Sequence, residues 1–248
     1  MSRPEKLLKM MGGLGYGSRR DVERLFVEER VTDVDGERLY GDDRVEHARV
    51  LLDGKPLDPS EGSVIVLHKP EGFICSTDDP GGRLIYELLP HRFRHRNPVL
   101  ASIGRLDKET SGLLLLTDDG QFLHKVISPK SSVQKLYEAD LARPLEGGEV
   151  ETLASGTLIL KSESKPCVPA KLVPMGGKTV RLVLTEGRYH QARRMLAAVG
   201  NHVDKLRRVA IGGITLDGLE EGAWRLLTPD EKKAVFAPLD DRLLQPVS

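Results

Sequence analysis

The stretch from Gly104 to Thr117, GRLDKETSGLLLLT, constrains the fold of this chain more than any other. A short polar turn lies between two apolar runs, 98–103 and 113–116, and each run has the length of a buried strand. Glycines at both ends of the turn favour a hairpin. The pattern therefore predicts that one carboxylate, Asp107, lies at the edge of a sheet. From spacing alone, a salt-bridged structural aspartate and a functional one are equally good interpretations.

Short apolar runs typical of strands recur along the rest of the chain, whereas helical patterns are fewer. Because strands and helices do not alternate regularly, we expect a mainly antiparallel mixed sheet and an α+β fold. Strands are predicted at 64–67, 72–76, 99–103, 113–117, 135–141, 157–160, 179–184, 203–209 and 213–216, and helices at 84–89, 121–126, 148–154, 189–199 and 229–236. Two of these helices carry end signals, because Gly200 can end one and Thr228 can cap the other.

The beginning of the chain is predicted to form a separate small α+β domain of residues 1–60. A linker with a proline and a glycine, at 57–62, would join it to a larger domain of residues 61–248. Two Asp-Gly pairs, at 35–36 and 53–54, lie between short apolar runs and predict hairpin turns.

A basic helix is expected within this small domain. A first helix at 4–11 ends in a glycine-rich stretch, and Ser18 is placed to cap a second helix. Apolar residues at helical spacing face inward on the second helix, whereas Arg19, Arg20 and Arg24 face outward. A generic small cap without RNA-binding function is the alternative interpretation.

Composition limits the class of protein. A chain of 248 residues, 39% hydrophobic and 30% charged, can bury a sizeable core in one or two domains. No apolar run approaches the roughly 18 residues of a membrane span, and the first residues lack a signal-type apolar region. Cys75 and Cys167 stand far apart and outside any CxxC context, so a disulfide framework or a zinc site is not expected. We therefore expect a protein of the reducing cytoplasm.

The formal net charge of zero conceals a segregation of charge along the chain. The stretch 178–208 is basic, with Lys178, Arg181, Arg188, Arg193, Arg194, Lys205, Arg207 and Arg208 against only Glu186 and Asp204. A second basic cluster lies at 92–96. Such clusters are compatible with phosphate binding and equally with an ordinary solvated surface.

Four segments, in order along the chain, resemble the motifs of the RsuA-like branch of the pseudouridine synthase family. They are His68-Lys69-Pro70 with 82–90, the GRLD string with the TSGLL that follows it, Lys135-Leu136-Tyr137, and EGRYHQARRMLAAVGNH at 186–202 with Ile211-Gly212-Gly213-Ile214 after it. The first 60 residues resemble an S4 RNA-binding domain. The resemblance implies a catalytic domain that isomerises a uridine of ribosomal RNA without a cofactor.

The resemblance also implies the partners. It favours 16S ribosomal RNA, free or in a ribosomal subunit precursor, and a monomer without membrane contact. A sister enzyme for 23S ribosomal RNA and a non-catalytic RNA-binding assembly factor are the alternatives. His91 and His95 have the spacing of metal ligands but no cysteine or acidic companions, so no metal site is expected.

By this resemblance, Asp107 is the catalytic nucleophile or general base and Arg193 is its basic partner. Uridine must be detached at N1, turned over and reattached through C5, so a carboxylate must reach the ribose or the base. A buried acid stays ionised when a cation pairs with it. Tyr137 would offer the uracil an aromatic face and a hydroxyl, and Leu184 would line the base pocket. Their structural alternatives are a half-buried strand tyrosine and an ordinary core leucine.

The resemblance also suggests residues for holding RNA. A target base in a duplex must be extruded, and Arg105 could fill the vacated stack or hold a flanking phosphate. Its alternative is a surface ion pair with Glu109. Lys69 could hold phosphate or cap the sheet, and His190 and Gln191 could position the arginine partner or meet RNA.

The arginines of the second helix complete the expected RNA contacts. Arg19, Arg20 and Arg24 would contact phosphates and position the RNA without reading its sequence.

Overall fold

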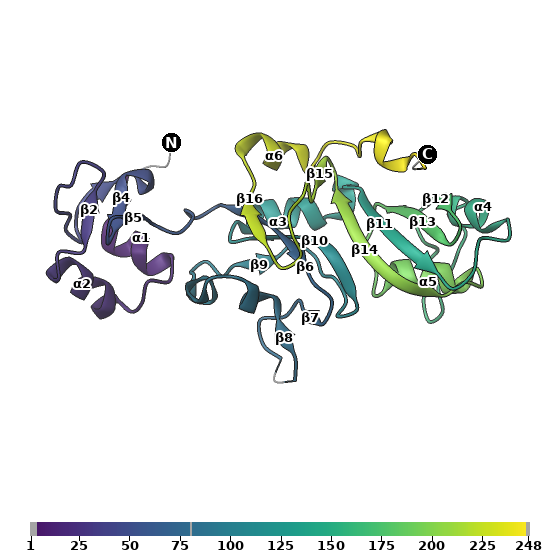
Figure 1. The fold of residues 1–248 in the computed structure, drawn as a ribbon, viewed down its shortest axis with the longest axis horizontal. Helices are drawn as coiled ribbons and strands as arrows, with labels where there is room; N and C mark the ends of the chain where they lie inside the picture. Colours follow the sequence, from purple (N-terminus) through teal and green to yellow (C-terminus); the bar gives the residue numbers. More distant parts are fainter. Residues whose placement is uncertain (1–3, 80, 247–248) are drawn as a thin grey trace. The chain divides into compact units, whose positions relative to one another are not determined.

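The apolar run that follows Asp107 is an interior strand of the largest sheet (Figure 1). The computed structural model describes residues 4–79 and 81–246, and in it this run is β10 (Thr110–Thr117). All four of its leucines, 113–116, are fully buried. The order of strands is β12 (Lys171–Gly176), β13 (Thr179–Leu184), β11 (Lys135–Leu141), β14 (Val203–Ile211), β10, β6 (Val64–Lys69) and β16 (Trp224–Leu226). Two short strands extend it, because β9 (Ala101–Ser102) pairs with β10 and β15 (Ile214–Thr215) pairs with β14.

The expected α+β fold with a mainly antiparallel mixed sheet is confirmed. β14 runs parallel to β10 and antiparallel to β11, and β11 and β12 each run antiparallel to β13. A glycine allows the parallel pair to form, because Gly112 lies opposite Arg208 and a Cβ there would stand 2.2 Å from the Arg208 carbonyl oxygen.

Helices α4 (Glu149–Ala154) and α5 (Gln191–Ala198) pack against the sheet beside its later strands. α5 buries Met195 and Leu196 in a core shared with β13 and β14, which also includes Leu153 of α4. α3 (Gly120–Ile127) follows β10, and α6 (Pro229–Ala234) begins at Thr228 with the predicted capping box. The predicted end of α5 is also confirmed, because Gly200 adopts a φ of 81° just beyond it. None of the described helices has both the length and the apolar composition that crossing a bilayer requires.

The chain divides into two compact units. One comprises the chain up to Val64 with Tyr86–Ala101 and Thr117–Gly120, and the other comprises Ile65–Ile85, Ser102–Leu116 and the chain from Gln121 onward. The second unit contains the helices described above apart from the first residue of α3, together with most of the large sheet and the small parallel pair of β7 (Phe73–Ile74) and β8 (Arg83–Leu84).

The first unit has its own core between two helices and two small sheets. α1 (Leu7–Gly13) and α2 (Arg19–Val27) pack through residues such as Met11 and Phe26. One sheet pairs β1 (Glu5–Lys6) with β3 (Arg44–Val45), and the other orders β2 (Val31–Asp33), β4 (Val50–Leu52) and β5 (Lys55–Pro56). The predicted cap of α2 is confirmed as a capping box between Ser18 and Asp21. The predicted turn at 53–54 joins β4 to β5.

The basic cluster at 92–96 contributes to the interior of this first unit. Arg96 and Asp118 form an ion pair at 2.7 Å in which both side chains are almost completely buried. Arg92 pairs with Asp58 at 2.7 Å. Two arginines of this cluster therefore hold segments of this unit together.

Three details of the predicted secondary structure differ from the structure. The strand expected at 157–160 is wrong, because this segment is irregular, although Leu160 is buried and the Leu158 carbonyl accepts from the Cys167 amide. The helix expected at 84–89 is a short 3₁₀ turn at Ile85–Leu88. β12 and β16 were not predicted, and both lie at the ends of the strand order.

Candidate active site

The predicted hairpin places Asp107 in the turn between β9 and β10. The Ile103 amide donates to the Leu115 carbonyl at 2.7 Å, and the Thr110 amide donates to the Asp107 carbonyl at 3.1 Å. The Asp107 side chain is about one-quarter exposed and lines a cleft of about 620 Å³ in the second unit. A cleft of this size can hold a nucleotide-sized ligand.

The buried side chain of Lys69 holds this turn in place. The Lys69 side chain has no exposure, and its ammonium donates to the carbonyls of Pro70, Asp107 and Thr110 at 2.9, 3.1 and 2.8 Å. Burial lowers the pKa of Lys69. Because all three donors are used and the group is covered, Lys69 supports the backbone of the turn. This corrects its assignment to RNA binding in favour of the structural alternative.

The carboxylate of Asp107 faces a histidine at the start of α5. His190 Nε2 lies 3.2 Å from Asp107 Oδ1. His190 adopts a left-handed backbone conformation with φ of 48°, which is unusual for a residue other than glycine. Its ring stacks on that of Tyr189, with centroids 3.8 Å apart and planes inclined by 17°. Tyr189 itself is 76% exposed at the mouth of the cleft.

The expected ion pair between Arg193 and Asp107 is not present among the described residues. Arg193 donates instead to the carbonyls of Val203 and Glu109, at 2.8 and 3.0 Å. Glu109 belongs to the same turn as Asp107, so the guanidinium holds the turn by its backbone and not by the Asp107 side chain. The direct pairing is therefore corrected to an indirect contact, with His190 next to the carboxylate.

Tyr137, Leu184 and Arg208 form the floor of the cleft. Tyr137 lies opposite Leu182 on one neighbouring strand and Arg208 on the other. Its hydroxyl accepts from Arg208 Nη1 at 3.4 Å. Leu184 is buried and lines the cleft, as expected of a residue beneath a base.

Sequence reasoning missed the position of Arg208, which it counted only as part of a basic stretch. The side chain is 2% exposed, and its Nε donates to the Leu113 carbonyl at 2.7 Å. A β-bulge in β14, between the pairs Leu136–Ala210 and Tyr137–Arg208, brings Arg208 and Ile211 to the same face. Neither the bulge nor the cross-strand pairing leaves a signal in the local sequence.

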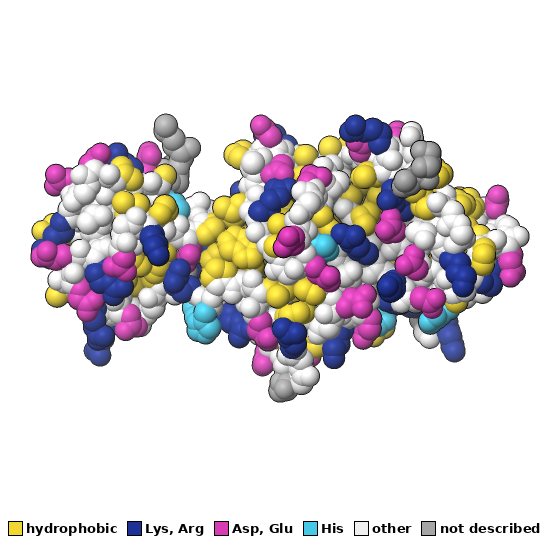
Figure 2. Space-filling model, in the orientation of Figure 1, with side chains coloured by type: hydrophobic (Ala, Val, Ile, Leu, Met, Phe, Trp, Pro, Cys, Tyr) yellow, Lys and Arg dark blue, Asp and Glu magenta, His cyan; other side chains and the backbone are white. Residues whose placement is uncertain are grey.

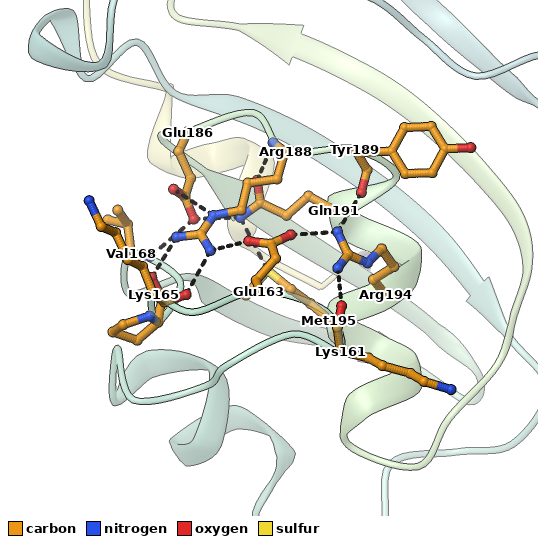
Figure 3. A network of polar contacts seen from close by, with 11 residues as sticks. Lys161, Glu163, Lys165, Val168, Glu186, Arg188, Tyr189, Gln191, Arg194 and Met195 are labelled. Atoms are coloured by element: carbon orange, nitrogen blue, oxygen red, sulfur yellow. Dashed lines mark hydrogen bonds and ion pairs between the residues drawn. The ribbon is translucent and has the colours of Figure 1, made fainter.

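A network of ion pairs fixes the segment 186–191 that carries His190 (Figure 3). The carboxylate of Glu163 accepts from both Arg188 and Arg194, and Arg188 also donates to Glu186 at 3.1 Å. Gln191 is buried, with its amide donating to Glu186 at 2.7 Å and its carbonyl accepting from the Arg188 backbone at 2.8 Å. Gln191 therefore shapes this segment, which corrects its assignment to RNA contact.

Ion pairs hold some of the basic side chains of the stretch 178–208. Arg181 pairs with Glu138 at 2.7 Å, and Arg188 and Arg194 pair with Glu163. On the face shown in Figure 2, basic and acidic side chains are interspersed. Three of its eight basic side chains therefore form internal ion pairs, whereas Lys178, Lys205 and Arg207 are exposed.

Arg105 is the contrasting case at the rim of the cleft. Its side chain is exposed, and within residues 4–79 and 81–246 it forms no ion pair or hydrogen bond, so the alternative pair with Glu109 is not formed. A free guanidinium in this position is available to an incoming ligand. Over the same described residues, no group of three or more His, Cys, Asp or Glu side chains is arranged to hold a metal ion.

Comparisons with known proteins agree with this geometry. Residues 63–198 match the family model described as RNA pseudouridylate synthase. The chain is 39% identical over 240 residues to ribosomal small subunit pseudouridine synthase A of Yersinia pestis, covering 95% of this chain and 99% of that protein. It is 43% identical over 188 residues to the protein of the same name from Escherichia coli K12, covering 75% and 80%. A crystal structure of pseudouridylate synthase superposes with a TM-score of 0.66 at 34% identity, covering 95% of this chain and all of that one.

Proposed function

The chain belongs to the RNA pseudouridylate synthase family, and from this premise we propose that it converts a uridine of 16S ribosomal RNA to pseudouridine with Asp107 as the catalytic carboxylate. The observation that carries the residue assignment is the position of Asp107. Its carboxylate is partly exposed in the cleft, with His190 beside it and Tyr137 on the cleft floor. The relatives named for the small ribosomal subunit support 16S over 23S ribosomal RNA.

The reaction needs no net oxidation or hydrolysis. The N1–C1′ bond breaks, the uracil turns over, a C5–C1′ bond forms, and the proton on C5 is lost while N1 gains one. A carboxylate can serve as nucleophile or base in this sequence, through an acylal, a Michael adduct or a glycal. Tyr137 supplies an aromatic face for the base and a hydroxyl that can relay a proton.

Positioning residues support the carboxylate in this proposal. Lys69 and Arg193 hold the turn by its carbonyls, and His190 occupies the place beside the carboxylate that substrate would share. Arg105, free at the rim, would fill the stack from which the target base is extruded or hold the flanking phosphate.

We also propose that residues 1–60 act as an S4-like RNA-binding domain, joined to a catalytic domain of residues 61–248. Arg20 and Arg24 are exposed on α2, and within the described part of the chain they form no ion pair. Arg19 pairs with Glu23 at 2.9 Å, but this pair is exposed and weak, which leaves Arg19 available to phosphate. The proposed rRNA substrate is either free or in a subunit precursor, and its modification would take place in the cytoplasm. We also propose that the enzyme acts as a monomer.

The experiment that tests this function maps pseudouridine in ribosomal RNA from cells with and without the protein. Loss of one pseudouridine from 16S ribosomal RNA, restored by the purified protein acting on that RNA, is the expected result. Loss from 23S ribosomal RNA alone would replace the substrate with the sister alternative. An unchanged map of both RNAs would contradict an rRNA substrate.

A further inference from the structure

A half-buried lysine on the floor of the cleft has no role in the account above. Lys135 lies on β11 opposite Leu184 of β13 and Ile211 of β14, and all three side chains line the cleft. Within the described residues its ammonium has one partner, the carbonyl of Val133 at 3.2 Å. Two of its three donors are therefore free.

A second cation lies one step along the same strands. Arg208 is buried opposite Tyr137, and its Nη2 is covered without a hydrogen-bond partner among the described residues. Burial and the neighbouring Arg208 charge lower the pKa of Lys135 to about 8. The positive charges of Lys135 and Arg208 repel each other because no acid lies between them. An electron-rich group that enters the cleft would relieve this repulsion.

We propose that Lys135 is a catalytic residue whose ammonium donates to an exocyclic carbonyl oxygen of the target uracil, in the field of the Arg208 guanidinium. This inference rests on the proposed function. When the N1–C1′ bond breaks, the electron pair stays on the detached uracil and its charge spreads to O2 and O4. A fixed donor is most effective where charge develops in the reaction.

The position of Lys135 favours the base over a backbone phosphate. Its cross-strand neighbours are apolar, and one of them, Leu184, is the residue assigned to the base pocket. The exposed arginine at the rim, Arg105, is better placed for phosphate. Contact with the base would appear in the chemical step, whereas contact with phosphate would appear in RNA affinity and its salt dependence.

The test compares Lys135→Met with Lys135→Arg, and uses Lys171→Met as the matched control. Lys171 is exposed on β12 of the same sheet and does not line the cleft. Met removes the charge with little change in length, and because Lys135 is half-buried beside Arg208 its removal should not impair folding. Arg keeps the charge at all accessible pH values. Single-turnover pseudouridine formation, kcat/KM against pH and RNA Kd are measured for each.

Removing the charge should lower the single-turnover rate about 100-fold and leave the Kd within about twofold of the control, because the contact forms in the chemical step. The wild-type kcat/KM should fall as pH rises through about 8, since the ammonium that donates is lost above its pKa. Lys135→Arg should keep most of the rate, and its kcat/KM should not fall as pH rises through about 8. If kcat/KM of Lys135→Arg still falls at alkaline pH, another group such as Cys75, which also lines the cleft, titrates there, and the proposal is overturned.

Two other outcomes also overturn it. A Lys135→Met rate equal to that of Lys171→Met would show that the ammonium does not act in the reaction. Weakened RNA binding with an unchanged rate would make Lys135 a phosphate contact. In both cases wild-type pseudouridine formation on 16S ribosomal RNA leaves the proposed function standing, whereas an inactive wild type overturns that function and this inference together.

Discussion

The two segments that meet at the contact between Asp107 and His190 are held by different interactions. The Asp107 turn is fixed through its backbone, by a fully buried lysine and by strand pairing on either side. The His190 segment is fixed through side chains, by the partly exposed network around Glu163. Asp107 is therefore held by the backbone of the turn that leads into the sheet, whereas the position of His190 depends on ion pairs that can rearrange.

This difference suggests how the site can be both rigid and open to substrate. A carboxylate that must reach the reacting atoms gains from fixed placement. A histidine that covers it must yield when a nucleotide enters. The left-handed conformation of His190 is maintained by its surroundings, and the network in Figure 3 is the part of those surroundings that mutation can loosen selectively.

Among changes that leave Asp107 itself in place, the largest effect is expected from breaking the support of its turn. Lys69→Met removes the donor to three carbonyls, one buried and two partly buried, so the free energy of unfolding should fall by about 3 kcal/mol and pseudouridine formation should fall with it. Urea denaturation and a tritium-release assay measure both quantities, with Lys171→Met as the control. Stability within about 0.5 kcal/mol of wild type would mean that Lys69 does not hold the turn.

A smaller and purely functional effect is expected from loosening the His190 segment. Glu163→Gln removes the shared acceptor of Arg188 and Arg194, and kcat/KM should fall about tenfold because the segment loses its fixed position. Glu151→Gln, an exposed change on α4, is the control. If the rate and its salt dependence match the control, ion pairing does not position His190.

The pH dependence of the same segment has a definite sign. Arg188 and Arg194 hold the pKa of Glu163 below its ordinary value of 4.5. The network therefore contributes fully above pH 4.5 and loses its contribution as pH falls through the lowered pKa. NMR shifts of the backbone amides at 186–191 should follow this transition in wild type and not in Glu163→Gln. A transition that survives in the variant would belong to another group.

The smallest effect on chemistry is expected from the first unit. Changing Arg20 and Arg24 to Gln should weaken rRNA binding. It should also reduce the slope of log affinity against log salt concentration by about 1.5, because each of the two phosphate contacts contributes about 0.7 to 0.9. The single-turnover rate at saturating RNA should not change. An unchanged affinity and slope between about 50 and 200 mM salt would show that α2 does not bind phosphate.

The sequence predicted best those features that depend on neighbouring residues. The apolar run of β10, the turn that carries Asp107 and the caps at Ser18 and Thr228 are local patterns, and the structure contains each of them. β12 escaped prediction because Pro174 interrupts its pattern, which an edge strand tolerates.

Features that depend on distant pairing could not be predicted in the same way. The position of Arg208 depends on a bulge opposite Tyr137, 71 residues away in sequence. In place of the expected contact with Asp107, the Arg193 guanidinium donates to two backbone carbonyls. Spacing brings residues to the same region, but it does not determine which acceptor a long side chain reaches.

The central claim is that the fixed carboxylate of Asp107 performs the chemistry, and Asp107→Asn tests it most directly. The substitution keeps the size of the side chain and leaves the backbone contacts of Lys69 and Arg193 in place. Single-turnover tritium release from 16S ribosomal RNA should disappear, while the RNA Kd and the unfolding transition remain those of the Asp204→Asn control, an exposed change on β14. A rate near that of wild type would contradict the account.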